Sequence, residues 1–424
     1  MLLPDDGGLV ARDPALDALA TVLDPEKFGA AIRAAAPEVA LDRVEPWYLR
    51  YKPGTSCLAA YRLMIGGRNV IAHALTAVDP TKLRFRSGDE APGGSFGTLG
   101  VHLRRGTILL RVFPNDPGLS RLRRLLDPTT RDRLLSGPLG GGSLELIGYK
   151  PDRRYVGRLT APDGTFAVKL HAKNRFDSAV AGAAAFQSSG PLVIAPMEHL
   201  DAGACLTVQR WMPGDLLADV QDQVGFDPAR ARAVGAALAE LHRTEALGLV
   251  SRERSSETIL ELGDTLARLC PGLATAARTQ AATLFGAFHE LAEPAGPVHG
   301  DFYAKQVLIH GDRAVVLDCD QARVGDPAED LGNFRAHQLR DVLRGRLARV
   351  RADAIWEAVQ DGYGRPAGGF RLRVQLFVAI GCWRLVADPF RHREPAWARR
   401  SAELLDLSAA ALAPILTAAG SARQ

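Results

Sequence analysis

Two carboxylates and one amide in this chain have an order and spacing that suit phosphoryl transfer. The segment His299–Gln306 reads HGDFYAKQ, and Asp318-Cys319-Asp320 begins twelve residues after Gln306. An acid, then an amide, then a second acid after a short β-hairpin is the order in which a catalytic loop and a metal loop present these groups. Such chemistry needs an acid that orients the acceptor hydroxyl, oxygen ligands for Mg²⁺ and a lysine on the phosphates.

Each residue of these two segments has an expected role. Asp301 is expected to orient the acceptor hydroxyl, and His299 to brace the loop through hydrogen bonds. Asp318 is the expected main Mg²⁺ ligand, the Gln306 carbonyl a second ligand, and Asp320 a further contact in the metal site. Taken alone, either segment could be a turn or a solvated strand end; together and in this order they favour a catalytic site.

A lysine and a basic turn are candidates for binding the phosphates of ATP. Lys169 ends the apolar run Phe166-Ala167-Val168, which places it on a small sheet as a phosphate-binding lysine would be. An exposed lysine on an edge strand would show the same pattern. Arg154 closes the basic stretch Gly148–Arg154, which stands where a phosphate-covering loop is expected but contains no GxGxxG.

A hinge is predicted after the strand-like run Leu206–Val208. Gln209, Trp211 and Met212 follow that run, and the backbone there could hydrogen-bond the edge of an adenine. Packing is an equally good explanation for Trp211.

The composition narrows the class of protein. A length of 424 residues predicts two or three domains, and 47% hydrophobic with 24% charged residues is ordinary for a soluble globular protein. A net charge of +4 gives no case for nucleic-acid binding, and no run approaches the roughly 18 apolar residues that a membrane span needs. The five scattered cysteines and the absence of a signal-peptide pattern lead us to expect a reduced, cytoplasmic protein.

The chain divides into three blocks. Residues 1–137 precede a Gly-rich linker at 137–143, residues 144–212 are predicted to be mainly strands, and residues 213–424 are predicted to be mainly helical. Two β-hairpins are expected, one around Pro162-Asp163 and one around Gly311-Asp312. A helix is expected to start at Asp227-Pro228.

One stretch of the first block is similar in sequence to a stretch of the second block. The sequence Tyr51-Lys52-Pro53-Gly54 resembles Tyr149-Lys150-Pro151-Asp152, and His73 corresponds to Lys169 further along. We interpret this as a duplicated β-rich unit whose first copy has lost its lysine. Chance similarity between two hairpins is the alternative.

At His299–Gln306, Asp318–Asp320 and Gly325–Asp330, the chain resembles the aminoglycoside phosphotransferase and choline kinase-like family. The resemblance implies an α+β, protein-kinase-like two-lobed fold, with a small β-rich N-lobe at 144–212 and a large helical C-lobe at 213–424. It also implies ATP- and Mg²⁺-dependent transfer of the γ-phosphoryl group to a hydroxyl of a small molecule. By the same resemblance Asp301 is the catalytic acid/base, Asp318 and Gln306 bind the metal, and Lys169 binds the phosphates.

Two positions depart from the family pattern. Gln306 stands where the family usually has asparagine, yet it keeps the same carbonyl ligand; the maltokinase and glucosamine kinase-like branch also has glutamine there, together with an N-terminal cap domain. Residues 1–137 could be such a cap. No glutamate follows Lys169 until Glu198, so a helix partner for the lysine is missing, and Asp177 is an uncertain substitute.

The acceptor is expected to be small. Gly325–Asp330 follows the metal loop almost at once and leaves no room for a peptide-binding segment. Asp326 is the expected helix N-cap, Asp330 is expected to support the catalytic loop, and His242 is expected to be a surface or packing residue.

The charge of the C-terminal helices bears on the acceptor's identity. Residues 335–424 contain 15 Arg, no Lys and 8 Asp or Glu. Because a polycationic aminoglycoside prefers an acidic cleft, this basic region favours a sugar, an aminosugar or an anionic metabolite. An antibiotic kinase and a non-catalytic pseudokinase that binds a nucleotide or a partner remain alternatives.

Overall fold

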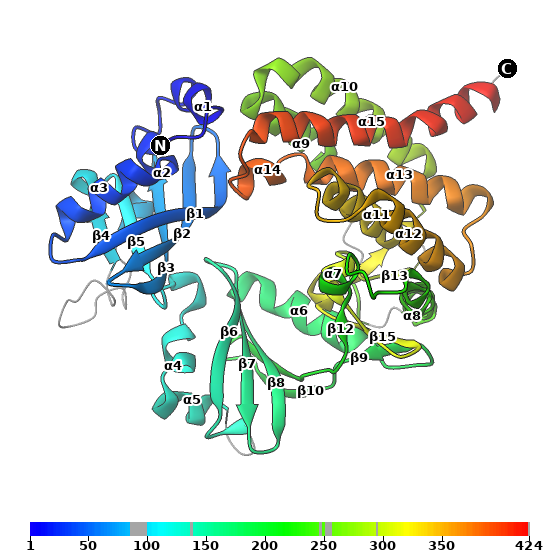
Figure 1. Cartoon of the computed structure of the whole chain (residues 1–424), viewed down its shortest axis with the longest axis horizontal. Coiled ribbons are helices and arrows are strands. Elements are labelled where there is room, and N and C mark those ends of the chain that lie inside the picture. Colours follow the sequence, from blue (N-terminus) through cyan, green and yellow to red (C-terminus); the bar gives the residue numbers. More distant parts are fainter. Residues whose placement is uncertain (85–99, 136–138, 246–247, 251–256, 294–295, 423–424) are drawn as a thin grey trace. The chain divides into compact units, whose positions relative to one another are not determined.

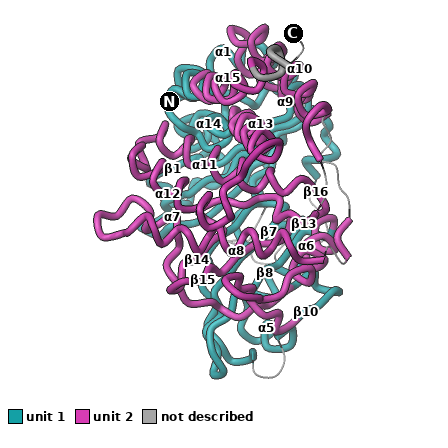
Figure 2. The backbone as a smooth tube through the Cα atoms, turned by 90° about the vertical axis from the view of Figure 1, so that its right-hand side faces the viewer, with its two compact units in different colours: residues 1–173, 200–206, 387–401 teal, residues 174–199, 207–386, 402–424 magenta. Residues whose placement is uncertain are grey.

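The computed structural model describes residues 1–84, 100–135, 139–245, 248–250, 257–293 and 296–422, and these form two compact units (Figure 2). Unit 1 contains Met1–Lys173, Leu200–Leu206 and Ala387–Ser401. Unit 2 contains Asn174–His199, Thr207–Val386 and Ala402–Gln424. Residues 137–138 of the predicted linker lie outside the described residues.

Unit 1 begins with three helices and a five-stranded antiparallel sheet of order β1-β2-β3-β5-β4 (Figure 1). Phe28 on α3 stacks on Tyr61 of β2 with ring centroids 4.0 Å apart, and both residues are fully buried. Helix and sheet therefore share one apolar core. The elements are α1 (Asp6–Arg12), α2 (Leu19–Leu23), α3 (Pro25–Ala35), β1 (Leu41–Lys52), β2 (Ser56–Ile65), β3 (Arg68–Ala77), β4 (Gly100–Leu103) and β5 (Ile108–Val112).

A second antiparallel meander of three strands follows in unit 1. It consists of β6 (Ser143–Lys150), β7 (Arg154–Ala161) and β8 (Gly164–His171), preceded by α4 (Leu122–Leu126) and α5 (Pro128–Leu134). The hairpin predicted around Pro162-Asp163 is confirmed, because Ala161 pairs with Gly164 across a two-residue turn. The segment Leu200–Leu206 lies beside the end of β8, where the His171 amide donates to the Cys205 carbonyl at 2.9 Å.

A segment from near the C-terminus completes unit 1. Arg393, just after α14 (Asp388–Arg391), forms an ion pair with Asp6 at 2.5 Å, and both side chains are almost fully buried. The Trp397 indole N–H donates to the same carboxylate at 3.0 Å. This buried carboxylate is therefore held by two side chains from the other end of the chain.

Unit 2 has a four-stranded sheet of order β12-β14-β15-β9, a two-stranded ribbon of β13 and β16, and otherwise helices. The predicted hairpin around Gly311-Asp312 and the helical character of the third block are confirmed. The elements are α6 (Lys173–Ala185), β9 (Leu192–Ile194), β12 (Asp215–Leu216), α7 (Leu217–Val220), α8 (Arg232–Arg243), α9 (Glu257–Leu269), α10 (Ala274–Leu291), β13 (Gly296–Val298), β14 (Val307–His310), β15 (Arg313–Val316), β16 (Arg323–Gly325), α11 (Ala328–Leu343), α12 (Arg349–Tyr363) and α13 (Gly368–Leu385).

Four of the described elements pass from one unit to the other along the chain. They are α6, whose first residue Lys173 belongs to unit 1, β10 (Met197–Asp201), β11 (Leu206–Arg210) and α15 (Trp397–Ala422). Within the described ranges, no helix combines the length and apolar character needed to cross a bilayer.

The helix predicted to start at Asp227-Pro228 has the expected cap but a different first turn. Asp227 accepts a hydrogen bond from the Ala229 amide at 2.9 Å, as an N-cap does. Residues Pro228–Ala231 form a 3₁₀ turn, and α8 begins only at Arg232. A 3₁₀ turn at a helix N-terminus is common, so the start signal was correct and the helix type was not.

Candidate active site

The loop around Asp301 begins where strand β13 ends. Gly300 has a φ of +78°, and a Cβ there would lie 2.2 Å from Arg323 Nη1 and 2.5 Å from the Gln321 carbonyl oxygen. Only glycine fits both the backbone conformation and the space. The glycine thus allows the loop to pass directly against the segment that follows Asp318–Asp320.

A single buried carboxylate holds the start of this loop. Asp330 on α11 accepts hydrogen bonds from the backbone amides of His299 at 2.7 Å and Gly300 at 2.9 Å. Burial opposes its ionised form, but the hydrogen bond and charge of His242, together with the charge of His299, outweigh burial and lower the pKa of Asp330. The expectation that Asp330 supports the loop is confirmed.

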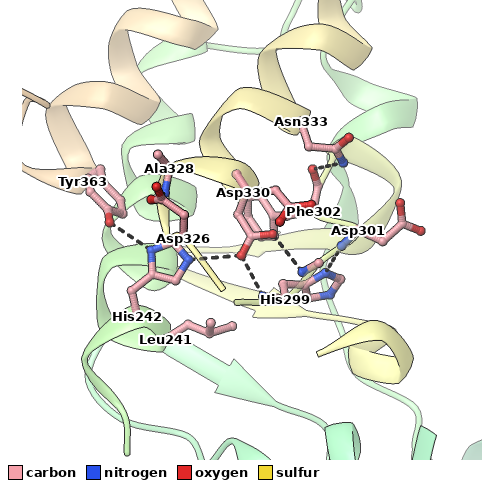
Figure 3. Close-up of polar contacts among 12 residues, drawn as sticks. Leu241, His242, His299, Asp301, Phe302, Asp326, Ala328, Asp330, Asn333 and Tyr363 are labelled. Carbon is pink, nitrogen blue, oxygen red and sulfur yellow. Dashed lines mark hydrogen bonds and ion pairs between the residues drawn. The ribbon is translucent and has the colours of Figure 1, made fainter. Parts of the chain in front are cut away.

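His242 on α8 extends the same network. Its Nε2 lies 3.1 Å from Asp330 Oδ2, and its Nδ1 lies 2.9 Å from the Tyr363 hydroxyl (Figure 3). The side chain is only 4% exposed. Of the two predicted alternatives for His242, a surface residue is wrong and a packing residue is correct, although the hydrogen bonds to Asp330 and Tyr363 were not predicted. Its partners come from α11 and α12, far away in the sequence, so no local pattern could have revealed them.

His299 links the loop to the end of β15. The ring is fully buried, and its Nε2 lies 2.7 Å from the Leu317 carbonyl, directly before Asp318. The Asp301 backbone amide lies 3.3 Å from its Nδ1. In Figure 3 the Asp301 carboxylate points away from the cluster of His299 and Asp330. The loop backbone is thus fixed from inside while the Asp301 carboxylate faces elsewhere.

The candidate metal ligands lie on two adjacent backbone segments. The Leu317 backbone amide donates to the Gln306 backbone carbonyl at 2.8 Å. Gln306 is thus the acceptor of this hydrogen bond, and Asp318 directly follows the donor. Asp318 has a left-handed backbone (φ +61°, ψ +50°), which is uncommon for a residue other than glycine. Gln306 is buried, whereas Asp318 and Asp320 are half-buried.

Carboxylate and amide oxygens are hard donors that suit Mg²⁺. No group of three or more His, Cys, Asp or Glu side chains in the described ranges is arranged to hold a metal.

Helix α6 packs closely against the metal loop at a glycine. A Cβ at Gly182 would lie 1.9 Å from the Cys319 carbonyl oxygen. Gly182 was not predicted to matter from the sequence, although its place in an alanine-rich helix is a weak sign of close packing. Helix α6 carries no glutamate, and Asp177, its one acid, is exposed.

Two nucleotide-binding candidates lie on the second meander of unit 1. Lys169 on β8 is only 9% exposed and pairs with Val156 of β7. Arg154 is half-buried at the start of β7 and pairs with His171. The turn between β6 and β7, at 151–153, is the stretch predicted to cover the phosphates.

The predicted hinge begins inside the end of β11, at Gln209, and belongs to unit 2. The Gln209 amide donates to the Ala195 carbonyl at 3.3 Å, and the Arg210 backbone amide donates to Pro196 at 2.9 Å. Trp211 is exposed and Met212 is half-buried. Hydrogen bonds join the Asp301 loop to the Asp318 loop. The hinge residues lie at the end of a separate strand. Lys169 and Arg154 lie in unit 1.

An aromatic pair lies directly beyond Asp301. Tyr303 stacks on His337 of α11, with ring centroids 4.1 Å apart. Burial, together with the positive charges of Arg340, Arg344 and Lys305, holds the pKa of His337 well below its usual value. A neutral imidazole surrounded by cations therefore lies next to the catalytic loop.

The family model described as the phosphotransferase enzyme family (APH) matches residues 145–368, more than half of the chain. The chain belongs to this family. As a member of the APH family it is an enzyme that transfers phosphate to a hydroxyl group of a small molecule, and its α+β, protein-kinase-like fold is the one that the resemblance implied.

Solved structures of related proteins share low identity with this APH-family chain. A choline/ethanolamine kinase family protein from Mesorhizobium loti is 18% identical, with a TM-score of 0.48, 69% of this chain covered and 93% of that chain covered. The macrolide 2′-phosphotransferase MphH from Brachybacterium faecium is 20% identical, with a TM-score of 0.44, 65% of this chain covered and 98% of that chain covered. No curated relative matches the chain.

Proposed function

We propose that this enzyme transfers the γ-phosphoryl group of Mg-ATP to a hydroxyl of a sugar or aminosugar. One observation carries the proposal. The Asp301 loop is fixed by two hydrogen bonds to buried Asp330, while the His299 ring ties it to the residue before Asp318. A rigid backbone that holds one carboxylate beside the candidate metal loop suits phosphoryl transfer, because this chemistry depends mainly on positioning and electrostatics.

The residue roles follow from this arrangement. Asp301 orients the acceptor hydroxyl and accepts its proton as the oxygen attacks. Gln306 and Asp318 would hold Mg²⁺, with Asp320 as a further oxygen donor, and the ion would neutralise charge on the phosphates. Lys169 and Arg154 bind phosphate oxygens, and the hinge at Gln209, Trp211 and Met212 contacts the base.

Charge near the catalytic loop supports a sugar-type acceptor. Three cations act on His337 beside Tyr303, namely Arg344, Lys305 and Arg340, the last of which is ion-paired with Asp341 at 2.9 Å. A polycationic aminoglycoside would be repelled there, whereas a sugar can pack a ring face on an aromatic surface. Several arginines of the basic C-terminal region, such as Arg335 and Arg384, form ion pairs within unit 2, so the local charge is a better guide than the total.

A phosphorylation screen tests the proposal. Hexoses, disaccharides, aminosugars and aminoglycosides are incubated with the protein and ATP or GTP, and products are read by mass spectrometry. We expect a product carrying one added phosphoryl group from a sugar or aminosugar. The Asp301→Ala variant should lose about 10²–10⁴-fold in kcat, because general acid–base catalysis contributes that much, while ATP binding survives.

The outcomes separate the alternatives. Phosphorylated aminoglycosides alone would indicate an antibiotic kinase. ATP binding without turnover across the whole screen would favour a pseudokinase. An Asp301→Ala variant with unchanged turnover would show that the catalytic assignment is wrong.

A further inference from the structure

Unit 1 contains the same supersecondary structure twice. The sequences Asp13-Pro14-Ala15-Leu16 and Asp116-Pro117-Gly118-Leu119 each precede a short helix, a second Asp-Pro and another helix. Helices α2 and α3 begin at Leu19 and Pro25, and α4 and α5 begin 103 residues later at Leu122 and Pro128. Each copy then forms a three-stranded meander. The similarity therefore extends beyond the strands and is too regular for chance.

The two meanders also share their turns. Lys52 pairs with Ser56 across a three-residue turn, as Lys150 pairs with Arg154. Counted from the turn that precedes the third strand, His73 and Lys169 occupy the same position, opposite Ala60 and Val156. Counted from the first turn they differ by two residues, because β2 has 10 residues and β7 has 8. The matching turns support the predicted duplication of a β-rich unit.

In the second copy, one buried aspartate clamps the turn between β6 and β7. Asp116 Oδ2 accepts from the Tyr149 hydroxyl at 2.8 Å and from the Asp152 backbone amide at 2.9 Å. Its Oδ1 accepts from the Gly118 amide at 2.8 Å. Asp116 is 5% exposed, so these donors compensate its burial.

The first copy has the same clamp on the turn between β1 and β2. Asp13 Oδ2 accepts from the Tyr51 hydroxyl at 2.6 Å and from the Gly54 backbone amide at 2.9 Å. In each copy the donors are a tyrosine at the strand end and the amide three residues later. The clamp is therefore part of the repeated unit, and the first copy is a matched control for the second.

The second copy differs in what its turn presents. Pro151 has no N–H, the Asp152 N–H is taken by Asp116, and the Arg153 N–H donates to the Lys150 carbonyl at 3.0 Å. A phosphate at this turn therefore cannot be bound by these backbone amides, as it is in glycine-rich loops. The basic side chains of the turn and its two ends are those of Lys150, Arg153 and Arg154.

The turn of the second copy is also held from the first copy. Asp152 adopts a φ of +59°, a conformation that glycine takes in the first copy at Gly54. Its carboxylate pairs with Arg50 Nη2 of β1 at 2.8 Å. A Cβ at Gly118 would lie 2.6 Å from the Asp152 Cα, so the Asp116 segment packs directly on the turn. These contacts fix a turn that lacks the glycines of a phosphate-covering loop.

We propose that Asp116 and Tyr149 are positioning residues for the nucleotide, which fix the β6–β7 turn so that its basic side chains, and not its backbone amides, meet the phosphates. This inference rests on the proposed function, since it concerns the same nucleotide. Side-chain hydrogen bonds of the clamp fix the conformation of this turn, which in a glycine-rich phosphate-binding loop is fixed by the backbone itself.

Steady-state kinetics with a matched pair of variants tests the clamp. Tyr149→Phe and Asp116→Asn should raise the KM for ATP about tenfold, the equivalent of one lost charge-assisted hydrogen bond, and leave kcat within about twofold. Tyr51→Phe and Asp13→Asn remove the same contacts from the first copy and should leave the KM for ATP unchanged. A general loss of stability would affect both pairs alike, so only a difference between them supports the proposal.

Hydrogen exchange of the free protein measures the clamp without nucleotide. The Asp152 amide should be protected in the wild type and exchange at least about tenfold faster in Asp116→Asn, because its acceptor is weakened. An unchanged KM for ATP in both second-copy variants, or equal changes in both pairs, would overturn the inference. A wild-type protein that binds no ATP would instead remove the proposed function itself.

Discussion

At the scale of single residues, the site is organised around carboxylates with different tasks. Asp330 is fully buried and accepts hydrogen bonds from two backbone amides of the catalytic loop. Asp301 and Asp318 are half-buried, as their proposed contacts with the acceptor and the metal require. With the structural acid separate from the two proposed functional acids, the loop backbone would stay fixed while Asp301 and Asp318 contact their ligands.

The metal role of Asp318 can be tested without disturbing the backbone. Asp318→Asn keeps a side chain that tolerates a left-handed backbone and removes only the negative charge. We expect Mg²⁺-dependent ATP binding to weaken by about tenfold or more, and binding in EDTA to stay the same. Calorimetric titration of ATP with Mg²⁺ and with EDTA measures both. Asp312→Asn, in the exposed hairpin turn, is the control, and an equal effect of both variants would contradict the metal role.

The sequence allows predictions for residues whose neighbours along the chain carry the signal. Asp301, Gln306 and Asp318 could be proposed because they follow one another along one loop and one hairpin, and their catalytic and metal roles stay predictions. His242 and Gly182 were missed, because their roles depend on partners that lie 88 and 137 residues away, at Asp330 and Cys319. Asp116 was missed for the same reason, since its clamp is visible only when the turn at Asp152 packs against it.

At the scale of elements, helix α6 supports the metal loop through one close approach. Gly182 leaves no room for a side chain beside Cys319. Helix α6 carries no glutamate, and in the described structure it packs closely at Gly182 against the Asp318 loop. The predicted boundary between a cap domain at 1–137 and an N-lobe from 144 stays a prediction. The repeated unit that ends at β8 begins near Asp116, which lies inside the predicted cap.

Filling that space should move α6 away from the metal loop. Gly182→Ala is expected to destabilise the protein by roughly 1–3 kcal/mol, as overpacking does, and to lower kcat. Gly286→Ala on α10 is the control, since nothing lies within 4 Å of its Cβ position. That variant should be neutral or stabilise the helix by up to about 1 kcal/mol. Thermal unfolding and turnover of both variants measure the contrast, and equal behaviour of the two would refute the packing argument.

At the scale of the whole molecule, segments far apart in sequence complete unit 1. Asp6 is bound by Arg393 and Trp397, and Asp152 of the second repeat is bound by Arg50 of the first. Removing one partner of the almost fully buried pair Asp6–Arg393 would leave an uncompensated charge. The N-terminal repeat is thus part of the structure that carries the β6–β7 turn.

The acidic cluster between the two repeats makes the stability of the chain depend on pH. Burial and the charge of Asp152 raise the pKa of Asp116 from 3.8 to about 6, while Tyr149 and backbone amides partly oppose this. Burial also opposes ionisation of Asp152, but His73, Arg50 and Arg111 outweigh it and lower its pKa. Because the folded pKa of Asp116 exceeds the unfolded one, its contribution to stability is complete below about pH 4 and is lost as pH rises through about 6.

Asp116→Asn removes this titration and should change the pH profile of unfolding. The stability of the wild type relative to Asp116→Asn is expected to fall by an amount on the order of 2 kcal/mol between about pH 4 and 6.5, and to stay level above that. Melting temperatures followed by circular dichroism across this range measure the difference. Tyr149→Phe keeps the carboxylate and should keep the pH dependence. A constant difference between wild type and Asp116→Asn would mean that Asp116 ionises alike in the folded and unfolded chain, and burial between the repeats would then not control its charge.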